Sequence, residues 1–578
     1  MLRRRLILAA APLTLTALVL AGCATQATVS SSSSSSATDS TSTVETTAAI
    51  DSDLDADAVL AANADVTVVE DDEWSEADAV DVTLSGSTAS SDSSAVTVDG
   101  STVTITEAGV FRLSGSLDGQ VVVAAPEDAQ VVLILDDAEI SASDSPAITV
   151  TSADDVAIAL AAGTTNTVSD ASTYADDATA NAAIYSDADL TITGSGSLEV
   201  SGNGNDGITS TDDLVILSGD ITVDAVDDAL RGKDSLTVAG GAIVLDAGGD
   251  ALKSDQDEDA TQGFIVVTGG SVTATSGDDG FAAVTDVVIT GGTVDVTAGS
   301  DASAADASPK GVSAGVVVAL DGGDITIDAA DDGVHSDGSV GIGGATLVVT
   351  AGDDGVHAEQ TLEIRDGDVT VADSVEGLEG AAIAISGGTV DVTSSDDGVN
   401  AASGSTSTGQ GGGGGGESDT GETLVISGGT VRIAAVGDGL DSNGSISLTG
   451  GTTVVSGPSS SGGQGAVDSN GAITIDGGEL LVAGSVLVAP AGGQQWVAAT
   501  VSGSAGDTIE VTDAAGTVIA TFEADQSFAA VFYSGPAVTD GGSYTVTVNG
   551  ASAATVTEGT NVSSGMGGGA GGGGGRRP

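Results

Sequence analysis

The chain has 578 residues and a formal net charge of −73, from 85 acidic against 12 basic residues, which argues against nucleic acid as a partner. It is 40% hydrophobic but only 2% aromatic, with 86 glycines, so its apolar residues suit thin layers of β-strand rather than a core of large rings. One cysteine and two histidines exclude disulfides and thiolate metal sites and leave little room for zinc chemistry.

Residues 1–23 are predicted to be a targeting segment. Arg3, Arg4 and Arg5 precede an apolar run from Leu6 to Leu20, which is short for a transmembrane anchor, the alternative interpretation. The sequence Leu20-Ala21-Gly22-Cys23 resembles a bacterial lipobox. This implies cleavage before Cys23, lipidation of its thiol, and attachment to the extracellular face of the cell membrane through the lipid.

The next two segments differ in composition. Residues 24–65 are rich in Ser, Thr and Asp, lack apolar periodicity, and are predicted to form a disordered tether. Residues 66–180 are β-rich and include the apolar run from Val131 to Leu135. We expect them to form an N-terminal β cap and the first coils of the repeat that follows.

Residues 181–483 contain a repeat of about 22 residues. An acid, a small residue and an aliphatic residue recur, as in Asp332-Gly333-Val334, and a glycine turn and an alternating strand follow half a repeat later. A unit this short cannot bury its own apolar face, so the repeats are predicted to stack in register as parallel coils. The aligned aliphatic residues are Ile184, Ile208, Leu230, Leu252, Phe281, Val312, Val334, Val356, Leu378, Val399, Leu440 and Val467.

The small residue before each aliphatic residue is Gly or Ala, which predicts a tight corner or close stacking there. Gly411 to Gly416 lie in the longest step between repeats, and we expect a loop that does not shift the phase.

The C-terminal part changes pattern. Residues 484–560 carry half of the aromatic residues and are predicted to form a C-terminal β cap, because an uncovered end of the rod would promote aggregation. Residues 561–578 are Gly-rich and are predicted to be a disordered tail.

An acid stands two residues before the aliphatic residue in nine of the twelve coils. Aligned carboxylates about 5 Å apart repel by roughly 1 kcal/mol in water and several-fold more near a protein surface, which demands cations or raised pKa values. Dense carboxylate oxygens favour calcium, and the alternative is that these residues only bond the backbone at turns. The predicted calcium ligands are Asp227, Asp228, Asp250, Asp255, Asp257, Glu258, Asp259, Asp278, Asp279, Asp331, Asp332, Asp353, Asp354, Asp396 and Asp397, with the sharpest cluster at Asp250–Asp259.

The residue after each aliphatic residue is expected to face solvent and to form a strip that binds an extended glycan, against the alternative of a solvated face without a ligand. His335 and His357 are neighbours in this strip and are not predicted to be a metal pair. Lys310 replaces the acid in one coil, as a counter-cation or, in the alternative, as the base of a calcium-dependent lyase. The predicted carbohydrate-binding residues are Arg231, Lys253, Lys310, His335, His357, Glu379 and Asn400.

The repeat resembles the bacterial parallel β-helix carbohydrate-binding family. The residues that carry the resemblance are Asn205 to Ile208, Asp250 to Asp259, Asp331 to Gly338, Asp353 to Ala358 and Glu376 to Gly380, within a similar region from about Val96 to Asn549. The resemblance implies an all-β, right-handed single-stranded parallel β-helix with bound calcium, which binds cellulose or acidic, pectin-like polysaccharide at the cell surface without established catalysis.

The predicted function is therefore a non-catalytic carbohydrate-binding lipoprotein, monomeric and dependent on calcium. An acidic glycan bridged to the acidic wall by calcium is favoured over cellulose, because aromatic platforms for neutral sugars are scarce along the coils. The alternatives are a calcium-dependent polysaccharide lyase with Lys310 or Lys253 as base, and a structural adhesin or spacer without a glycan site.

Overall fold

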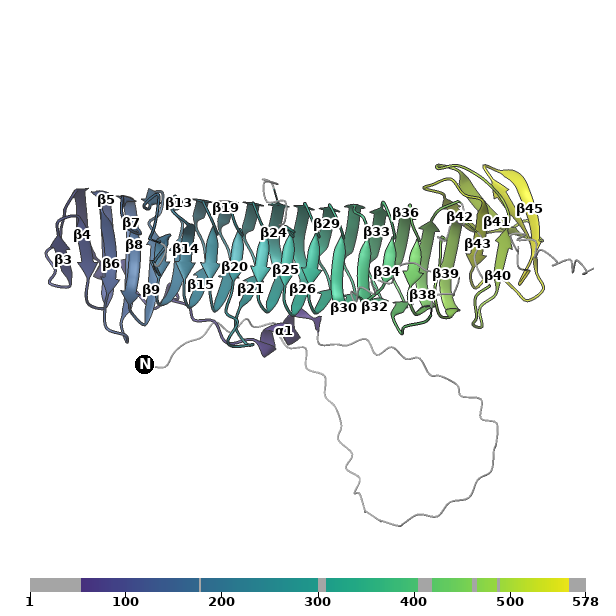
Figure 1. Cartoon of the computed structure of the whole chain (residues 1–578), viewed down its shortest axis with the longest axis horizontal. Coiled ribbons are helices and arrows are strands. Elements are labelled where there is room, and N and C mark those ends of the chain that lie inside the picture. Colours follow the sequence, from purple (N-terminus) through teal and green to yellow (C-terminus); the bar gives the residue numbers. More distant parts are fainter. Residues whose placement is uncertain are drawn as a thin grey trace, which may run out of the picture.

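The structure is a computed structural model that describes residues 54–175, 178–299, 308–403, 418–459, 465–485 and 489–560. Its described residues form 45 strands and two short helices, α1 (Ala56–Ala62) and the 3-10 helix η2 (Glu76–Asp78), so the predicted all-β class is confirmed. The strands stack along a long rod (Figure 1). In the described part, no helix combines the length and apolar character needed to cross a bilayer. The targeting segment with Cys23, the Gly411–Gly416 insertion and the Gly-rich tail lie outside the described residues.

Each coil contributes strands to three columns, and each strand pairs in parallel with its equivalent in the next coil. Column A carries the aligned aliphatic residues and comprises β11 (Ala182–Ser186), β14 (Asp206–Ser210), β17 (Leu230–Gly232), β20 (Leu252–Ser254), β23 (Phe281–Ala283), β25 (Val312–Ala314), β27 (Val334–Ser336), the starts of β30 (Val356–Ile364) and β32 (Leu378–Ile385), β34 (Val399–Ala401) and β37 (Leu440–Ser442).

Column B follows column A in each coil. It comprises β9 (Asp155–Leu160), β12 (Asp189–Gly194), β15 (Asp213–Ile216), β18 (Ser235–Val238), β21 (Phe264–Val267), the starts of β24 (Asp286–Ala298) and β26 (Val317–Ala329), β28 (Ser339–Ile342), the ends of β30 and β32, β35 (Thr423–Ile426), and the starts of β38 (Ser445–Ser456) and β39 (Ile473–Gly484). Column C comprises β10 (Thr165–Ser169), β13 (Ser197–Gly202), β16 (Asp220–Ala225), β19 (Ala242–Ala247), β22 (Ser271–Ser276), the ends of β24 and β26, β29 (Thr346–Ala351), β31 (Asp368–Asp373), β33 (Thr389–Ser394), β36 (Thr430–Ala435) and the ends of β38 and β39.

The predicted register of the aliphatic residues is confirmed. Leu230 pairs with Leu252, and Phe281 pairs with Val312 despite the longer step between them. Val399 likewise pairs with Leu440 across the longest step. The insertion therefore leaves the phase of the coils unchanged, as expected.

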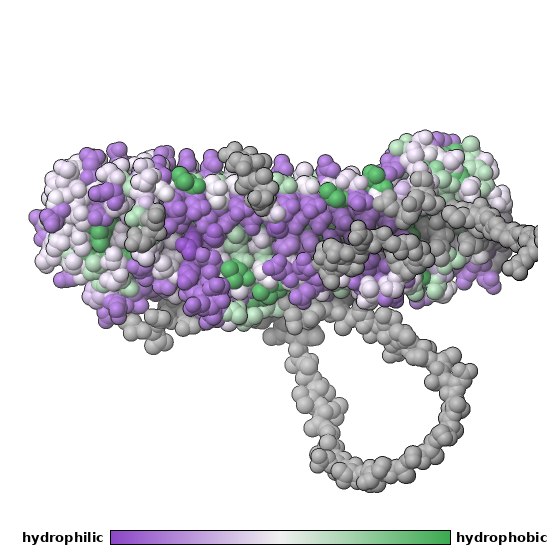
Figure 2. All heavy atoms as spheres, viewed as in Figure 1, coloured by the Kyte–Doolittle hydropathy of each residue, from purple (hydrophilic) through white to green (hydrophobic). Residues whose placement is uncertain are grey.

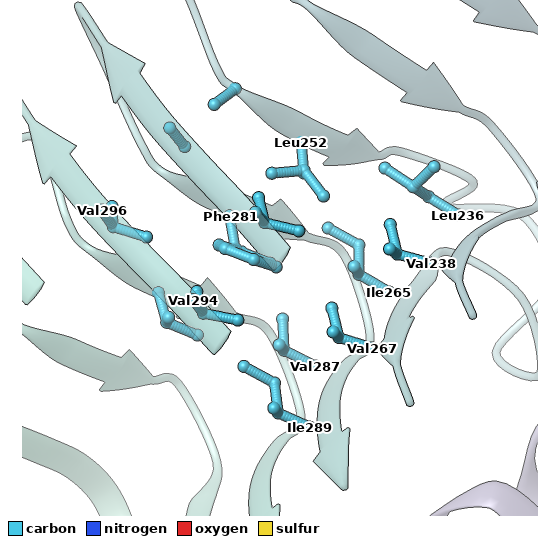
Figure 3. Packing of buried hydrophobic residues seen from close by; sticks show 14 of the residues in the cluster. Leu236, Val238, Leu252, Ile265, Val267, Phe281, Val287, Ile289, Val294 and Val296 are labelled. Atoms are coloured by element: carbon cyan, nitrogen blue, oxygen red, sulfur yellow. The ribbon is translucent and has the colours of Figure 1, made fainter. Parts of the chain in front are cut away.

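The interior is a continuous aliphatic core, because alternate residues of each strand point inward. In β19, for example, Ile243, Leu245 and Ala247 are buried while the residues between them are exposed. Figure 3 shows Leu252, Phe281 and Ile265 with their neighbours gathered between strands of successive coils. Stacked coils thus share a core that no single coil could enclose.

The small residue at each corner is explained by close stacking, as predicted. A Cβ atom built on Gly333 would lie 2.2 Å from Cγ1 of Val349, and one on Gly207 would lie 2.2 Å from Cγ1 of Val223. Both valines lie in the column C strand that follows the glycine along the chain, β29 for Val349 and β16 for Val223.

The predicted tether is wrong at its C-terminal end, where residues 54–65 belong to a folded arm that continues to residue 69. Val59 of α1 packs on Val288, and Val66 packs beside Phe264 and Val266 of column B. Polar contacts hold the arm too: Thr67 N donates to Asp213 Oδ2 at 2.7 Å. The arm folds because the outward side of column B is itself apolar over these coils, so each covers the other from water.

The two ends of the rod differ. Residues 66–180 supply β1 (Val80–Gly86), β2 (Ala89–Ser90), β3 (Val96–Asp99), β4 (Thr102–Ile105), β5 (Gly109–Asp118), β6 (Gln120–Ala124), β7 (Gln130–Ser141) and β8 (Ile148–Ser152), in which β3 and β4 pair antiparallel. At the other end, β43 (Ala530–Ser534) pairs antiparallel with β39 and with β40 (Trp496–Ala499). An antiparallel sheet of β41 (Thr508–Asp513), β42 (Val518–Glu523), β44 (Ser543–Val548) and β45 (Ala551–Thr557) completes this end, over a core that includes Phe522, Phe528 and Tyr533.

Candidate functional site

The acids before column A form one continuous feature, the acid ladder, which we define as Asp206, Asp228, Asp250, Asp279, Asp332, Asp354, Glu376, Asp397 and Asp438. Most ladder aspartates bond the next coil through one oxygen. Oδ1 of Asp228 accepts from Asp250 N at 2.9 Å, and Oδ1 of Asp250 accepts from Asp279 N at 3.0 Å. Asp279, Asp332 and Asp397 repeat this bond to the next coil. One oxygen of each of these aspartates is therefore occupied by a backbone N–H, but the bond reaches the next coil and is not the local turn contact of the alternative interpretation.

The second carboxylate oxygen faces the residue after the aliphatic one, three positions further along the chain. Lys253 Nζ lies 2.8 Å from Asp250 Oδ2 and 3.0 Å from Asp228 Oδ2, so one ammonium bridges two rungs. The residues after the aliphatic ones form a second column, the outer column, in which Arg231 pairs with Lys253 and Lys253 with Ala282. The expectation of a free solvent-facing strip is wrong here, since Lys253 is half-buried and neutralises the ladder.

The middle of the outer column contains both histidines. His335 Nδ1 lies 2.8 Å from Asp332 Oδ2, and His357 Nδ1 lies 3.3 Å from Asp354 Oδ2. Burial alone would raise the pKa of Asp332, but hydrogen bonds from the two imidazoles outweigh it and hold that pKa below its usual value. Burial opposes the charged form of His357, yet its contacts with Asp332 and Asp354 raise its pKa.

Beyond His357 the outer column supplies no cation. Its next residues are Glu379, Asn400 and Asp441, which pair in that order with no basic residue between them. Burial and the charges of Glu376 and Asp354 raise the pKa of Glu379 to about 10. Burial also raises the pKa of Asp438 to about 7. A hydrogen bond from the backbone of Gly465 opposes this shift, and the charges of adjacent acids add to it.

Asn400 gives this end of the ladder an additional oxygen donor. Its side chain is 9% exposed, and its Nδ2 donates to Glu376 Oε2 at 2.7 Å. Its Oδ1 is buried and has no hydrogen-bond partner. We call Glu376, Glu379, Asn400, Asp397, Asp438 and Asp441 the oxygen site. A set of carboxylate and amide oxygens without a basic side chain fits calcium better than any softer metal.

Figure 2 shows a hydrophilic band along the rod, on the face where Figure 1 places β20 and β25 of column A.

A model of the family of carbohydrate-binding domain-containing proteins matches residues 99–348 and 340–463. The chain belongs to this family. The predicted carbohydrate-binding family is confirmed at that level.

Individual relatives match shorter parts of this carbohydrate-binding family member. A carbohydrate-binding domain-containing protein of Acetivibrio thermocellus is 41% identical over 128 residues, which are 21% of this chain and 45% of that protein. The chain thus matches less than half the length of this curated relative. A solved structure of the polysaccharide lyase-like protein from C. thermocellum, a gadolinium derivative, is 35% identical, with a TM-score of 0.37 over 38% of this chain and 91% of that one.

The predicted calcium cluster at Asp250–Asp259 does not converge. Asp255 pairs with Arg231 at 2.6 Å, and Asp250 pairs with Lys253. Asp259 Oδ1 accepts from Thr261 N at 3.0 Å, and Asp257 and Glu258 are exposed beside it. No group of three convergent metal-ligand side chains within the described ranges includes a residue of this cluster. Acids that alternate along a loop were expected to share an ion, but turn contacts and nearby cations occupy them.

Other predicted ligands do come together. The convergent groups are Asp206 with Asp227 and Asp228, Asp331 with Asp332 and Asp353, and Asp397 with Asp438 and Asp441, together with two that include His357. Asp278, Asp279 and Asp396 join none of these groups in the described part of the chain. The structure also adds Asp206, Asp438 and Asp441, which the predicted site omitted.

Lys310 occupies the place of a ladder acid and acts as a counter-cation. Its Nζ lies 3.0 Å from Asp331 Oδ2 and its backbone N donates to Asp279 Oδ1 at 2.7 Å. Burial would lower its pKa, but Asp331 outweighs burial and raises it. Burial likewise opposes the charge of Lys253, while Asp250 and Asp228 raise its pKa above the usual value. A lyase base needs the opposite shift at neutral pH.

Proposed function

We propose that this member of the carbohydrate-binding family is a non-catalytic protein that binds acidic polysaccharide through calcium held on the acid ladder. The observation that carries the proposal is the oxygen site, a run of oxygen donors in which Glu376, Glu379, Asp397 and Asp438 form no ion pair with a basic side chain of the described residues, and in which Asp397, Asp438 and Asp441 converge. The lipobox-like sequence at Cys23 supports attachment to the outer face of the cell membrane. The strand pairing supports a right-handed single-stranded parallel β-helix as the architecture, and a monomer is the simplest working form.

The proposed chemistry follows from charge. A polyuronate and this protein are both anionic, so direct contact is repulsive. Calcium accepts six to eight oxygen ligands, and a ladder supplies them from only one side. An ion on Asp397, Asp438 and Asp441, whose carboxylates converge, therefore keeps coordination positions that a sugar carboxylate can fill. Asn400 Oδ1, which has no hydrogen-bond partner among the described residues, would complete the protein's share of the ligands.

The proposal is tested by measuring binding of polygalacturonate to the full chain in calcium and in excess chelator. We expect binding only with calcium, and at least a tenfold loss of calcium affinity for Asp441→Asn, which removes one carboxylate from the convergent group of Asp397, Asp438 and Asp441. Asp257→Asn is the matched control, because Asp257 is an exposed acid outside the oxygen site. Binding that survives in excess chelator would refute calcium dependence.

The same samples test the lyase alternative. Cleavage by a lyase would produce an unsaturated sugar that absorbs in the ultraviolet, and Lys310→Ala should then abolish it. We expect no such product from the wild-type protein in calcium. Binding of neutral cellulose in preference to polygalacturonate would show that the glycan class is wrong even if calcium is present.

A further inference from the structure

The two histidines of the chain meet at one carboxylate. Asp332 Oδ2 lies 2.8 Å from His335 Nδ1 and 3.7 Å from His357 Nδ1. One ligand atom from each of the three residues falls within 4.8 Å of the other two. The rings are edge to face, with centroids 4.9 Å apart. The coil register creates this pair, because His335 and His357 occupy equivalent positions of successive coils.

The surrounding contacts orient these three side chains. Asp332 Oδ1 accepts from Asp354 N at 3.1 Å, which fixes the carboxylate with Oδ2 toward the imidazoles. The other nitrogen of His335, Nε2, lies 3.3 Å from Asp337 Oδ1. A carboxylate on the remote nitrogen is the usual partner of a metal-ligating histidine, since it fixes the ring and its tautomer.

A further ligand is within reach. Asp354 Oδ2 lies 3.3 Å from His357 Nδ1, and Asp354, His357 and Glu379 form a second convergent group. The side chains of His335 and His357 are 14% and 16% exposed, so an ion could enter from solvent and then be largely enclosed.

We propose that Asp332, His335 and His357 form a binding site for a divalent transition metal of the zinc class, distinct from the oxygen site. Two imidazoles and a carboxylate are ligands that zinc favours, whereas calcium prefers oxygen alone. The ion would link two successive coils, as the ammonium of Lys253 does elsewhere on the ladder. A fourth ligand would come from Asp354 or from water.

Lys253 also provides the control. It occupies the outer-column position that His335 and His357 occupy, and it bridges two ladder acids without being a zinc ligand. The double variant His335→Lys with His357→Lys should therefore place ammonium groups beside the ladder acids, as Lys253 does, and keep the fold but lose the metal site. The single variants His335→Gln and His357→Gln are smaller changes that serve if the double variant does not fold.

The test titrates the metal-free full chain with Zn²⁺ by calorimetry and with Co²⁺ by visible absorption, in excess calcium. We expect one Zn²⁺ that calcium does not displace, Co²⁺ bands of the intense, low-symmetry type, and a tenfold or greater loss in each Gln variant. Asp337→Asn should weaken binding 10- to 100-fold while preserving stoichiometry.

Two results would overturn the proposal. If wild-type protein takes up no Zn²⁺ in excess calcium, the histidines act only as counter-cations for the ladder. If the Lys and Gln variants bind Zn²⁺ as the wild type does, the metal lies elsewhere. Circular dichroism and the melting temperature of each variant separate loss of the site from loss of the fold.

Discussion

Replacement of Asp279 by Asn should stabilise the metal-free protein at pH 8, and should stabilise it by less than half as much at pH 5. Burial, together with the charges of Asp250 and Asp278, raises the pKa of Asp279 from 3.8 to about 7, against the opposing bond from Lys310 N. The residue opposite it in the outer column is Ala282, which offers no charge. Asn retains an oxygen for the bond from Lys310 N but carries no charge to bury.

The sign and size follow from proton binding. Between pH 3.8 and about 7 the folded state holds a proton on Asp279 that the unfolded state has released. Its contribution to stability is therefore fully present below pH 3.8 and is lost as the pH rises through about 7. Three pKa units correspond to about 4 kcal/mol, and partial exposure of the side chain reduces this to about 2 kcal/mol.

The assay is urea denaturation in chelator at both pH values. Asp228→Asn is the matched control, since Asp228 makes the same bond to the next coil but also pairs with Lys253 at 3.0 Å. We expect the control to lose about 1 kcal/mol at either pH. Destabilisation of Asp279→Asn at pH 8, or an equal response of both variants, would refute the view that Asp279 is an uncompensated charge.

Three further predictions concern stability. Lys253→Met leaves two buried carboxylates without their shared cation and should cost about 2–4 kcal/mol in thermal or urea denaturation, whereas Lys233→Met, at a half-buried position, should change stability by about 0.5 kcal/mol or less. Phe281→Ala empties a fully buried position of the core and should cost about 3–5 kcal/mol; a smaller loss would mean that the coils collapse around the cavity. Deletion of residues 54–69 exposes the apolar side of column B and should increase binding of a hydrophobic dye, an effect that an equal deletion within residues 24–53 should not produce.

The sequence was sufficient to predict the register of the rod. A fixed repeat with an aliphatic residue at each corner permits only one stacking that buries every such side chain, so Phe281 and Val312 align although their step is longer. The folded arm at residues 54–69 was missed because its few apolar residues are scattered, and its partners, such as Phe264, lie far along the chain. Local composition cannot reveal a contact between segments so widely separated.

The candidate site was harder to predict because the acid and its partner lie on either side of a corner. In a straight strand, residues three apart face opposite sides. This alternation therefore predicts separate columns with separate functions for Asp250 and Lys253. The chain bends between them, and the two side chains meet at 2.8 Å. The signal was present in the spacing, since several ladder acids are followed three residues later by the group that they contact, as Asp250 is by Lys253 and Asp332 by His335.

This coupling explains why one repeated scaffold can provide different sites. The backbone bond made by each ladder acid is the same in most coils, so the fold constrains the acid but leaves the residue three positions later free to vary. Lys253 gives a neutral rung, His357 a nitrogen donor, and Glu379 a second carboxylate that raises the local demand for a cation. The identity of that single residue therefore decides whether the charge of the ladder acid is balanced by a side chain of the protein or needs an ion from solution. Exchange of His335 for Lys and of Asp441 for Lys should accordingly remove two different metals from the same rod, each without effect on the other, because the two convergent groups to which these residues belong share no residue, whereas joint loss of both metals in either variant would show that the rungs are not independent.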